Sequence, residues 1–88
     1  MAPLDRAAFA ALPEEIRLRL LKRAIDRFGH EGPAELGKVE ALLAVLDRAI
    51  ANGERLARLK QTLAGAAISL IRGRIHVDPA PPRRGNRA

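Results

Sequence analysis

Cysteine is absent from the sequence, which excludes disulfide bonds, thiolate metal sites and cysteine nucleophiles. A chain without cysteine suits a reducing compartment, and we expect a cytoplasmic protein. Long apolar runs are also absent, and none approaches the ~20 residues that span a bilayer. Asp5 and Arg6 fall where a secretory signal would need its apolar stretch. The sequence therefore predicts a soluble chain that does not span a membrane.

Aromatic side chains are nearly absent. The sequence has no tyrosine or tryptophan, and Phe9 and Phe28 are its only phenylalanines. Aliphatic residues must therefore form the small core that 88 residues can bury. Proteins usually read unpaired bases by stacking them on aromatic rings, so a nucleic acid would have to be held here through its phosphates and sugars.

Catalytic motifs are absent as well. His30 and His76 lie at no metal-ligand spacing, and Ser69 has no sequence cue for an orienting acid or an oxyanion hole. No phosphate-binding glycine loop of the Walker or dinucleotide type occurs. We therefore expect no active site, cofactor or metal in this chain.

Basic residues outnumber acidic ones. Sixteen Lys and Arg stand against ten Asp and Glu, which gives a net charge of +6. On so small a body this charge favours an anionic partner, with nucleic acid first and an acidic membrane second. The same charge is also compatible with a role in solubility alone. The positions of the cations in the fold distinguish an anion-binding role from a role in solubility.

The first half of the chain is predicted to be helical. Asp5 can cap a short helix over residues 6–12, and Pro13 suits the first position of a second helix that stops at Gly29. One half of the second helix is apolar at 100° per residue: Ile16, Leu20, Leu21, Ala24, Ile25 and Phe28. A narrower stripe predicts a third helix that ends at Asn52-Gly53: Val39, Leu42, Leu43, Leu46 and Ile50. The two stripes predict a helical hairpin, whose flank another element must cover.

Several cations lie on the second helix. Arg19, Lys22 and Arg23 belong to its polar side, whereas Arg17 projects from the middle of its apolar face. One interpretation of Arg17 is that its stem lies along the core and its head meets a carboxylate or a carbonyl. The other interpretation is a direct contact with a ligand.

The second half of the chain predicts a sheet. After Gly53 the apolar period changes from 3.6 to 2, and Ala64-Gly65 and Arg72-Gly73 suit two-residue hairpin turns. Counting outward from these turns gives a three-stranded antiparallel meander, with Gln61 as the one polar residue on its apolar face: Leu59, Leu63, Ala66, Ile68, Leu70, Ile75 and Val77. We therefore expect an α+β fold, in which a short helix and a helical hairpin pack against this meander.

The opposite face of the meander collects cations. It carries Arg58, Lys60, Thr62, Ser69, Ile71, Arg74 and His76, with Arg72 at the turn. No acidic residue lies between Arg55 and Val77, so we expect nothing on this face to offset its positive charge. We predict phosphate contacts at Arg58, Lys60, Arg72 and Arg74, with Arg19, Lys22 and Arg23 behind them and Arg17 last. The alternative is a solvated face whose cations discourage pairing between sheet edges.

We expect a compact domain followed by a disordered tail. Residues 1–78 should form the compact domain, and residues 79–88 should be a disordered basic tail rich in proline and arginine. The predicted sheet has unpaired strand edges, through which two copies of the chain can associate.

Three stretches resemble one known family, the bacterial tRNA(Ile)-lysidine synthetases, in their C-terminal substrate-binding region. These are "LPEEIRLRLLKRAI" at 12–25, "KVEALLAVLDRAI" before Gly53, and "QTLAGAAI" at 61–68 followed by "GRIHV". The family uses ATP to adenylate the wobble cytidine of tRNA(Ile) and then attaches lysine. The resemblance implies a tRNA(Ile) partner for the basic surface.

The resemblance also sets a limit on mechanism. The nucleotide-binding Ser-Gly-Gly-x-Asp-Ser loop of the family belongs to an N-terminal catalytic domain with no counterpart in this sequence. The resemblance therefore implies a non-catalytic tRNA-binding module that works with a catalytic N-terminal domain, where ATP would bind. At most Arg17, Arg19 and the 62–66 turn match motif positions. A small protein-interaction module without nucleic-acid binding is the alternative function.

Overall fold

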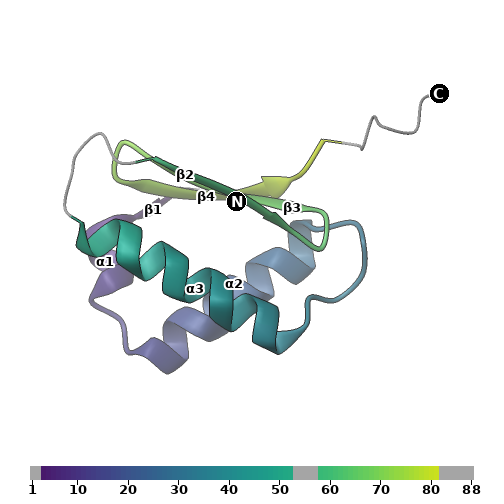
Figure 1. Ribbon diagram of the computed structural model, residues 1–88, viewed down its shortest axis with the longest axis horizontal. Coiled ribbons are helices and arrows are strands. Elements are labelled where there is room, and N and C mark those ends of the chain that lie inside the picture. The colour runs from purple at the N-terminus through teal and green to yellow at the C-terminus, as the bar shows by residue number, and fades with distance from the viewer. Residues whose placement is uncertain (1–2, 53–57, 82–88) are drawn as a thin grey trace.

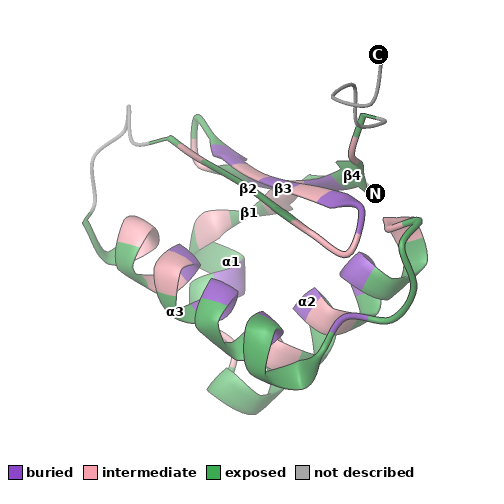
Figure 2. Ribbon diagram, turned by 45° about the vertical axis from the view of Figure 1, so that its right-hand side comes forward, coloured by how far each residue is buried: buried purple, intermediate pink, exposed green. Residues whose placement is uncertain are grey.

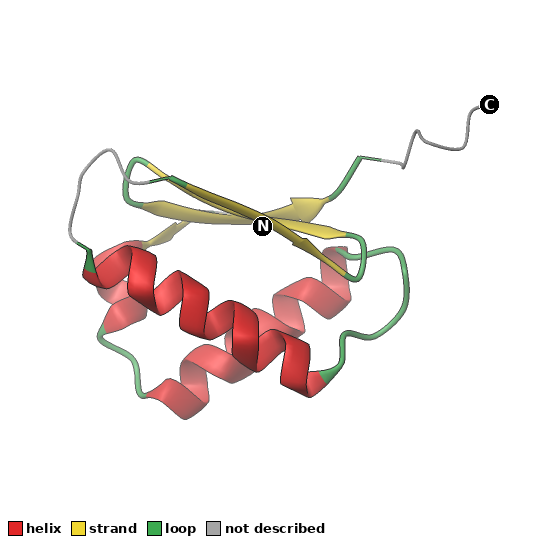
Figure 3. Cartoon of the chain, viewed as in Figure 1, coloured by secondary structure: helices red, strands yellow, loops and turns green. Residues whose placement is uncertain are grey.

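Residues 3–52 and 58–81 are described in the computed structural model of the chain. Its helices form one layer and its strands another, so the predicted α+β class is confirmed (Figures 1 and 3). The elements are β1 (Leu4–Asp5), α1 (Arg6–Ala10), α2 (Glu14–Phe28), α3 (Leu36–Ala51), β2 (Leu59–Leu63), β3 (Ala66–Ile71) and β4 (Arg74–Pro79). No helix within these residues is long and apolar enough to cross a membrane.

Within residues 3–52 and 58–81 the sheet has four antiparallel strands in the order β1-β4-β3-β2, not the three that the sequence predicts. The additional strand is β1, in which Leu4 pairs with Ile75 and Asp5 with Arg74. A strand of two residues has no periodic pattern, which is why the alternation of the sequence did not reveal it. Leu4 packs against the core, and Asp5 accepts a hydrogen bond from the Ala8 N–H at 3.0 Å, which caps α1.

The predicted register of the meander is confirmed. Leu59 pairs with Leu70, and Leu70 with Ile75 across the second turn. Both turns contain two residues with positive φ, at 54° and 82° for Ala64 and Gly65 and at 53° and 76° for Arg72 and Gly73. This conformation is that of a type I′ turn, whose twist matches the twist of the paired strands.

The core lies between the two layers, where the buried residues face one another (Figure 2). It is aliphatic apart from Phe9: Phe9, Leu21, Ala24, Ile25, Ala34, Val39, Leu42, Leu43, Leu46, Ala66, Ile68, Leu70, Ile75 and Val77. On α2 the predicted apolar half is only partly buried, because Ile16 and Leu20 both remain 37% exposed. Leu18 packs against the core instead, so the buried stripe is rotated relative to the prediction.

The connector between α2 and α3 packs against the β2–β3 turn. The Glu31 N–H donates to the Ala64 carbonyl at 3.1 Å, and the Ala80 N–H donates to the Gly65 carbonyl at 2.8 Å. His30 Nε2 lies 3.1 Å from the Ala80 carbonyl oxygen. The hydrogen-bonded structure therefore extends two residues into the predicted tail, which begins at residue 79. The remainder of the predicted tail, residues 82–88, lies outside the described residues.

Asp26 joins the connector to α2. Its Oδ1 accepts from the Ala34 N–H at 2.9 Å, and its Oδ2 accepts from Lys22 Nζ at 2.6 Å. The Lys22 hydrogen bond and then the Ala34 hydrogen bond lower the pKa of Asp26 below its ordinary 3.8, and burial opposes them. The folded state therefore favours the charged carboxylate.

This pKa shift predicts a weakening of the fold in acid. The contribution of Asp26 is complete above the unfolded-state pKa near ~4, and it is lost as the pH falls through the lower pKa of the folded state. Asp26→Asn keeps an acceptor for Ala34 but loses the charge, so its acid limb should be flatter, with a cost at pH ~7 below ~1 kcal/mol for so exposed a pair. Urea unfolding between pH 2 and 7 measures both effects, and identical acid limbs would contradict the prediction.

Candidate nucleic-acid interface

The outer face of the sheet brings together the four cations that the sequence ranks first. Lys60 pairs with Ser69, which pairs with His76, so these three side chains share the face that points away from the helices. Ile71 pairs with Arg74 on the same face, Arg72 follows at the turn, and Arg58 directly precedes β2. All four cations are exposed.

The prediction that this face carries no acid is wrong. Asp5 lies directly opposite Arg74, because β1 adds to the sheet, and Asp78 lies opposite Ala67, because β4 continues past Val77. Both carboxylates lower the positive potential near them. They leave Lys60, on the middle row with Ser69 and His76, without an acidic cross-strand neighbour.

Two of the predicted helix cations are ion-paired, whereas the sheet cations are not within the described segments. Arg19 pairs with Glu15 at 2.9 Å and Lys22 with Asp26 at 2.6 Å, and both pairs lie within α2. Arg23 is exposed on the same helix. Among residues 3–52 and 58–81, the sheet cations form no ion pair: Arg58, Lys60, Arg72 and Arg74. The sheet cations are therefore available to external anions at a smaller cost than Arg19 and Lys22, which must first leave a carboxylate.

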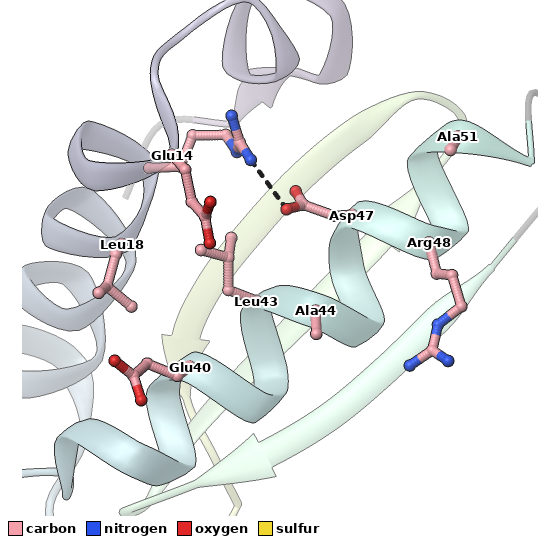
Figure 4. Close-up of a pocket in the computed structure, with 9 residues that line it drawn as sticks. Glu14, Leu18, Glu40, Leu43, Ala44, Asp47, Arg48 and Ala51 are labelled. Atoms are coloured by element: carbon pink, nitrogen blue, oxygen red, sulfur yellow. Dashed lines mark hydrogen bonds and ion pairs between the residues drawn. The ribbon is translucent and has the colours of Figure 1, made fainter.

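Arg17 lies between α2 and α3, away from the sheet surface. Its Nη1 donates to the Leu12 carbonyl at 2.6 Å. Its Nη2 donates to Asp47 Oδ2 at 2.9 Å, the contact that is dashed in Figure 4. Its side chain is only 16% exposed, and its buried Nε has no partner in the described part of the chain. These contacts support the packing interpretation of Arg17, in which its head meets both a carboxylate and a carbonyl.

The Arg17–Asp47 pair should therefore stabilise the helical layer. Arg17→Met is expected to lower the free energy of unfolding by about 2 kcal/mol, because it removes a charge-assisted hydrogen bond from a largely buried site. Arg19→Met is the matched control, since it breaks an exposed pair of the same 2.9 Å length and should cost at most ~0.5 kcal/mol. Urea denaturation compares them, and equal costs would contradict this account.

The hollow between α2 and α3 does not suit an anion. This groove of about 530 Å³ is lined by Glu14, Glu40 and Asp47, whose carboxylates lie between the two helices (Figure 4). Arg48 also lines it, and Asp47 is already paired with Arg17. Within the described segments no three His, Cys, Asp or Glu residues are placed to hold a metal ion. The groove is therefore a poor anion site, and the outer face of the sheet remains the candidate interface.

Arg6 is a basic residue that the sequence reasoning missed at this surface. Its N–H donates to the Gly73 carbonyl at 2.9 Å. A methyl group placed on Gly73 would lie 3.8 Å from Arg6 Cδ. Nothing in the local pattern links residue 6 to residue 73, so only the pairing of β1 with β4 could have revealed this neighbour.

Comparison with known proteins confirms the resemblance noted above. The chain is 60% identical over 93 residues to the tRNA(Ile)-lysidine synthase of Bradyrhizobium diazoefficiens, covering 96% of this chain and 26% of that protein. It is 64% identical over 85 residues to the synthase of Bradyrhizobium sp. BTAi1, with 91% and 24% covered. For the synthase of Rhodopseudomonas palustris the values are 58% over 85 residues, with 93% and 25% covered. The chain thus spans about a quarter of the length of these relatives. No family model matches the chain, and no solved structure matches it significantly.

Proposed function

We propose that this chain is the non-catalytic, tRNA-binding and positioning domain of a tRNA(Ile)-lysidine synthase, corresponding to its C-terminal substrate-binding region. Similarity to proteins of that name over nearly the whole chain supports the assignment. In this proposal the parent enzyme ligates lysine to the wobble cytidine of tRNA(Ile) with ATP. The ATP site and the catalytic groups would belong to an N-terminal domain outside this chain.

The observation that supports a binding role is that the sheet cations are exposed and, in the described part of the chain, unpaired. Arg58, Lys60, Arg72 and Arg74 are exposed on one face, and none is held by a carboxylate within the described segments. Such a face attracts phosphates, and binding gains entropy from the counterions that the RNA releases. Phe9 is buried, and Phe28 packs against the core with the Arg27 guanidinium 5.6 Å from its ring centre, so neither offers a free ring for base stacking. The domain would thus bind the phosphate backbone of the tRNA, and another domain would catalyse the reaction.

A direct test is the binding of fluorescently labelled tRNA(Ile) transcript to the 88-residue chain, followed by anisotropy from about 0.05 to 0.3 M salt. We expect binding whose logarithmic salt dependence has a slope of about 0.9 for each phosphate neutralised, or about 3 to 4 in total. Absence of RNA binding at the lowest salt concentration would refute the proposal. Salt-insensitive association with a protein, without RNA binding, would support the alternative interaction module, for which Ile16 and Leu20 offer exposed apolar surface.

A further inference from the structure

We propose that Arg6 is a further phosphate-binding residue, and that Arg6, Arg72 and Arg74 together hold the RNA backbone at the β3–β4 turn. This inference rests on the proposed RNA-binding function, and it assigns a particular end of the sheet as the anchoring point. We refer to these three residues as the arginine cluster.

The arginine cluster is assembled by the fold from two distant parts of the chain. Arg72 and Arg74 flank Gly73 at the turn, and Arg6 begins α1 directly after β1. The hydrogen bond from the Arg6 N–H to the Gly73 carbonyl, at 2.9 Å, fixes the start of α1 against this turn. Gly73 has no side chain, and the atoms nearest to its open position are Cδ and Nε of Arg6. The stem of Arg6 therefore passes over the turn itself.

The charge balance of this end of the sheet favours an anion. Asp5 is the acid paired opposite Arg74, and its carboxylate already accepts the capping hydrogen bond from Ala8 at 3.0 Å. In the described part of the chain, neither Arg6, Arg72 nor Arg74 forms an ion pair with it. Three guanidinium groups against one carboxylate leave a net positive charge. Guanidinium groups suit this task because their planar fork can donate two hydrogen bonds to one phosphate.

The backbone of Arg72 supports a binding role for its side chain. Arg72 has φ of 53° at the first central position of a type I′ turn, where asparagine or glycine is favoured. The side chain is exposed, so core packing does not account for the choice of arginine. A residue that departs from the local preference of a turn without a packing reason is expected at a functional position.

A comparison of Arg6→Gln with Arg48→Gln in the 88-residue chain tests the arginine cluster. Arg48 is exposed on α3 in the helical layer, so both changes remove one charge but only Arg6→Gln removes a guanidinium from the turn. For labelled tRNA(Ile) transcript at about 0.15 M salt, we expect Arg6→Gln to weaken binding roughly fivefold and to lower the salt slope by about 0.9. Arg48→Gln should change the affinity less than ~2-fold, because it alters only the long-range field, which salt screens.

Three further results decide between the inference and the function on which it rests. Wild-type chain that binds no RNA overturns the proposed function, whereas equal effects of Arg6→Gln and Arg48→Gln overturn only the arginine cluster. If Arg6→Gln fails to fold, as judged by circular dichroism, Arg72→Asn replaces it as the test. Asparagine suits the turn, so this variant should melt at or above the wild-type temperature and still bind RNA roughly fivefold more weakly. Unchanged affinity in a folded Arg72→Asn variant would also refute the cluster.

Discussion

Neutralising Arg58, Lys60 and Arg74 together, as Arg58→Gln, Lys60→Gln and Arg74→Gln, is expected to weaken tRNA binding about 100-fold at about 0.15 M salt. Each of these cations is exposed on the outer face of the sheet and without an ion pair in the described segments. Three lost phosphate contacts should also lower the logarithmic salt slope by about 2.7. Glutamine keeps a polar side chain at each exposed position, so the fold should be preserved.

The matched control neutralises three cations of α2 instead, as Arg19→Gln, Lys22→Gln and Arg23→Gln. The net charge of the chain falls by the same amount, but two of these cations are already paired with Glu15 and Asp26. We expect the loss of affinity to stay below about 10-fold, since most of it comes from the weakened long-range field. Equal losses in the two triple variants would show that net charge, and not the sheet face, determines binding. A larger loss in the α2 variant would place the RNA on the helical layer.

Gly65→Ala is expected to lower the free energy of unfolding by about 3 kcal/mol. Gly65 has φ of 82°, a conformation that costs an L-residue about 1–2 kcal/mol. A methyl group there would also lie 2.7 Å from His30 N and 3.0 Å from Glu31 N, both of them backbone atoms of the packed connector. Relieving this overlap requires the turn and the connector to separate, at a further cost of about 1–3 kcal/mol. For a small domain this is a large share of its total stability.

Gly73→Ala is the control, because the two glycines occupy the same position in the two hairpin turns. Gly73 has φ of 76°, but a methyl group there would meet only the flexible side chain of Arg6, at 3.8 Å. Gly73→Ala should therefore lower the free energy of unfolding only by the cost of the positive φ, about 1–2 kcal/mol. The free energies of unfolding of the two variants, measured in urea, separate the cost of backbone strain from the cost of steric overlap. Equal costs would mean that the connector does not press on the β2–β3 turn as the structure shows.

The register of the meander was predictable because each turn carries its own signal. Ala64-Gly65 and Arg72-Gly73 fix two-residue loops, and with a side-chain period of 2 such loops assign every side chain to a face. The same reasoning placed Gln61 on the apolar face without explaining it. The structure supplies the reason: β2 is an edge strand, and Gln61 is exposed in a groove beside Lys38 and Val45 of α3.

The charge distribution of the outer face was less predictable because it depends on tertiary contacts. Asp5 and Arg6 read locally as the start of a short helix, and only the pairing of Leu4 with Ile75 brings them to the sheet. The partner of Arg17 is another such case, since Asp47 lies 30 residues away. Local patterns determine which face a side chain occupies within an element. They do not determine which elements become neighbours.

The measurement that tests the central claim most directly is a map of the RNA contact on the labelled 88-residue chain. Titration of the ¹⁵N-labelled protein with a short RNA hairpin would report amide shifts residue by residue. We predict that the changes concentrate on the outer face of β2, β3 and β4, on the β3–β4 turn and on Arg6, and that they fade as salt is added. Changes confined to α2 and α3, with the sheet amides unmoved, would contradict the account.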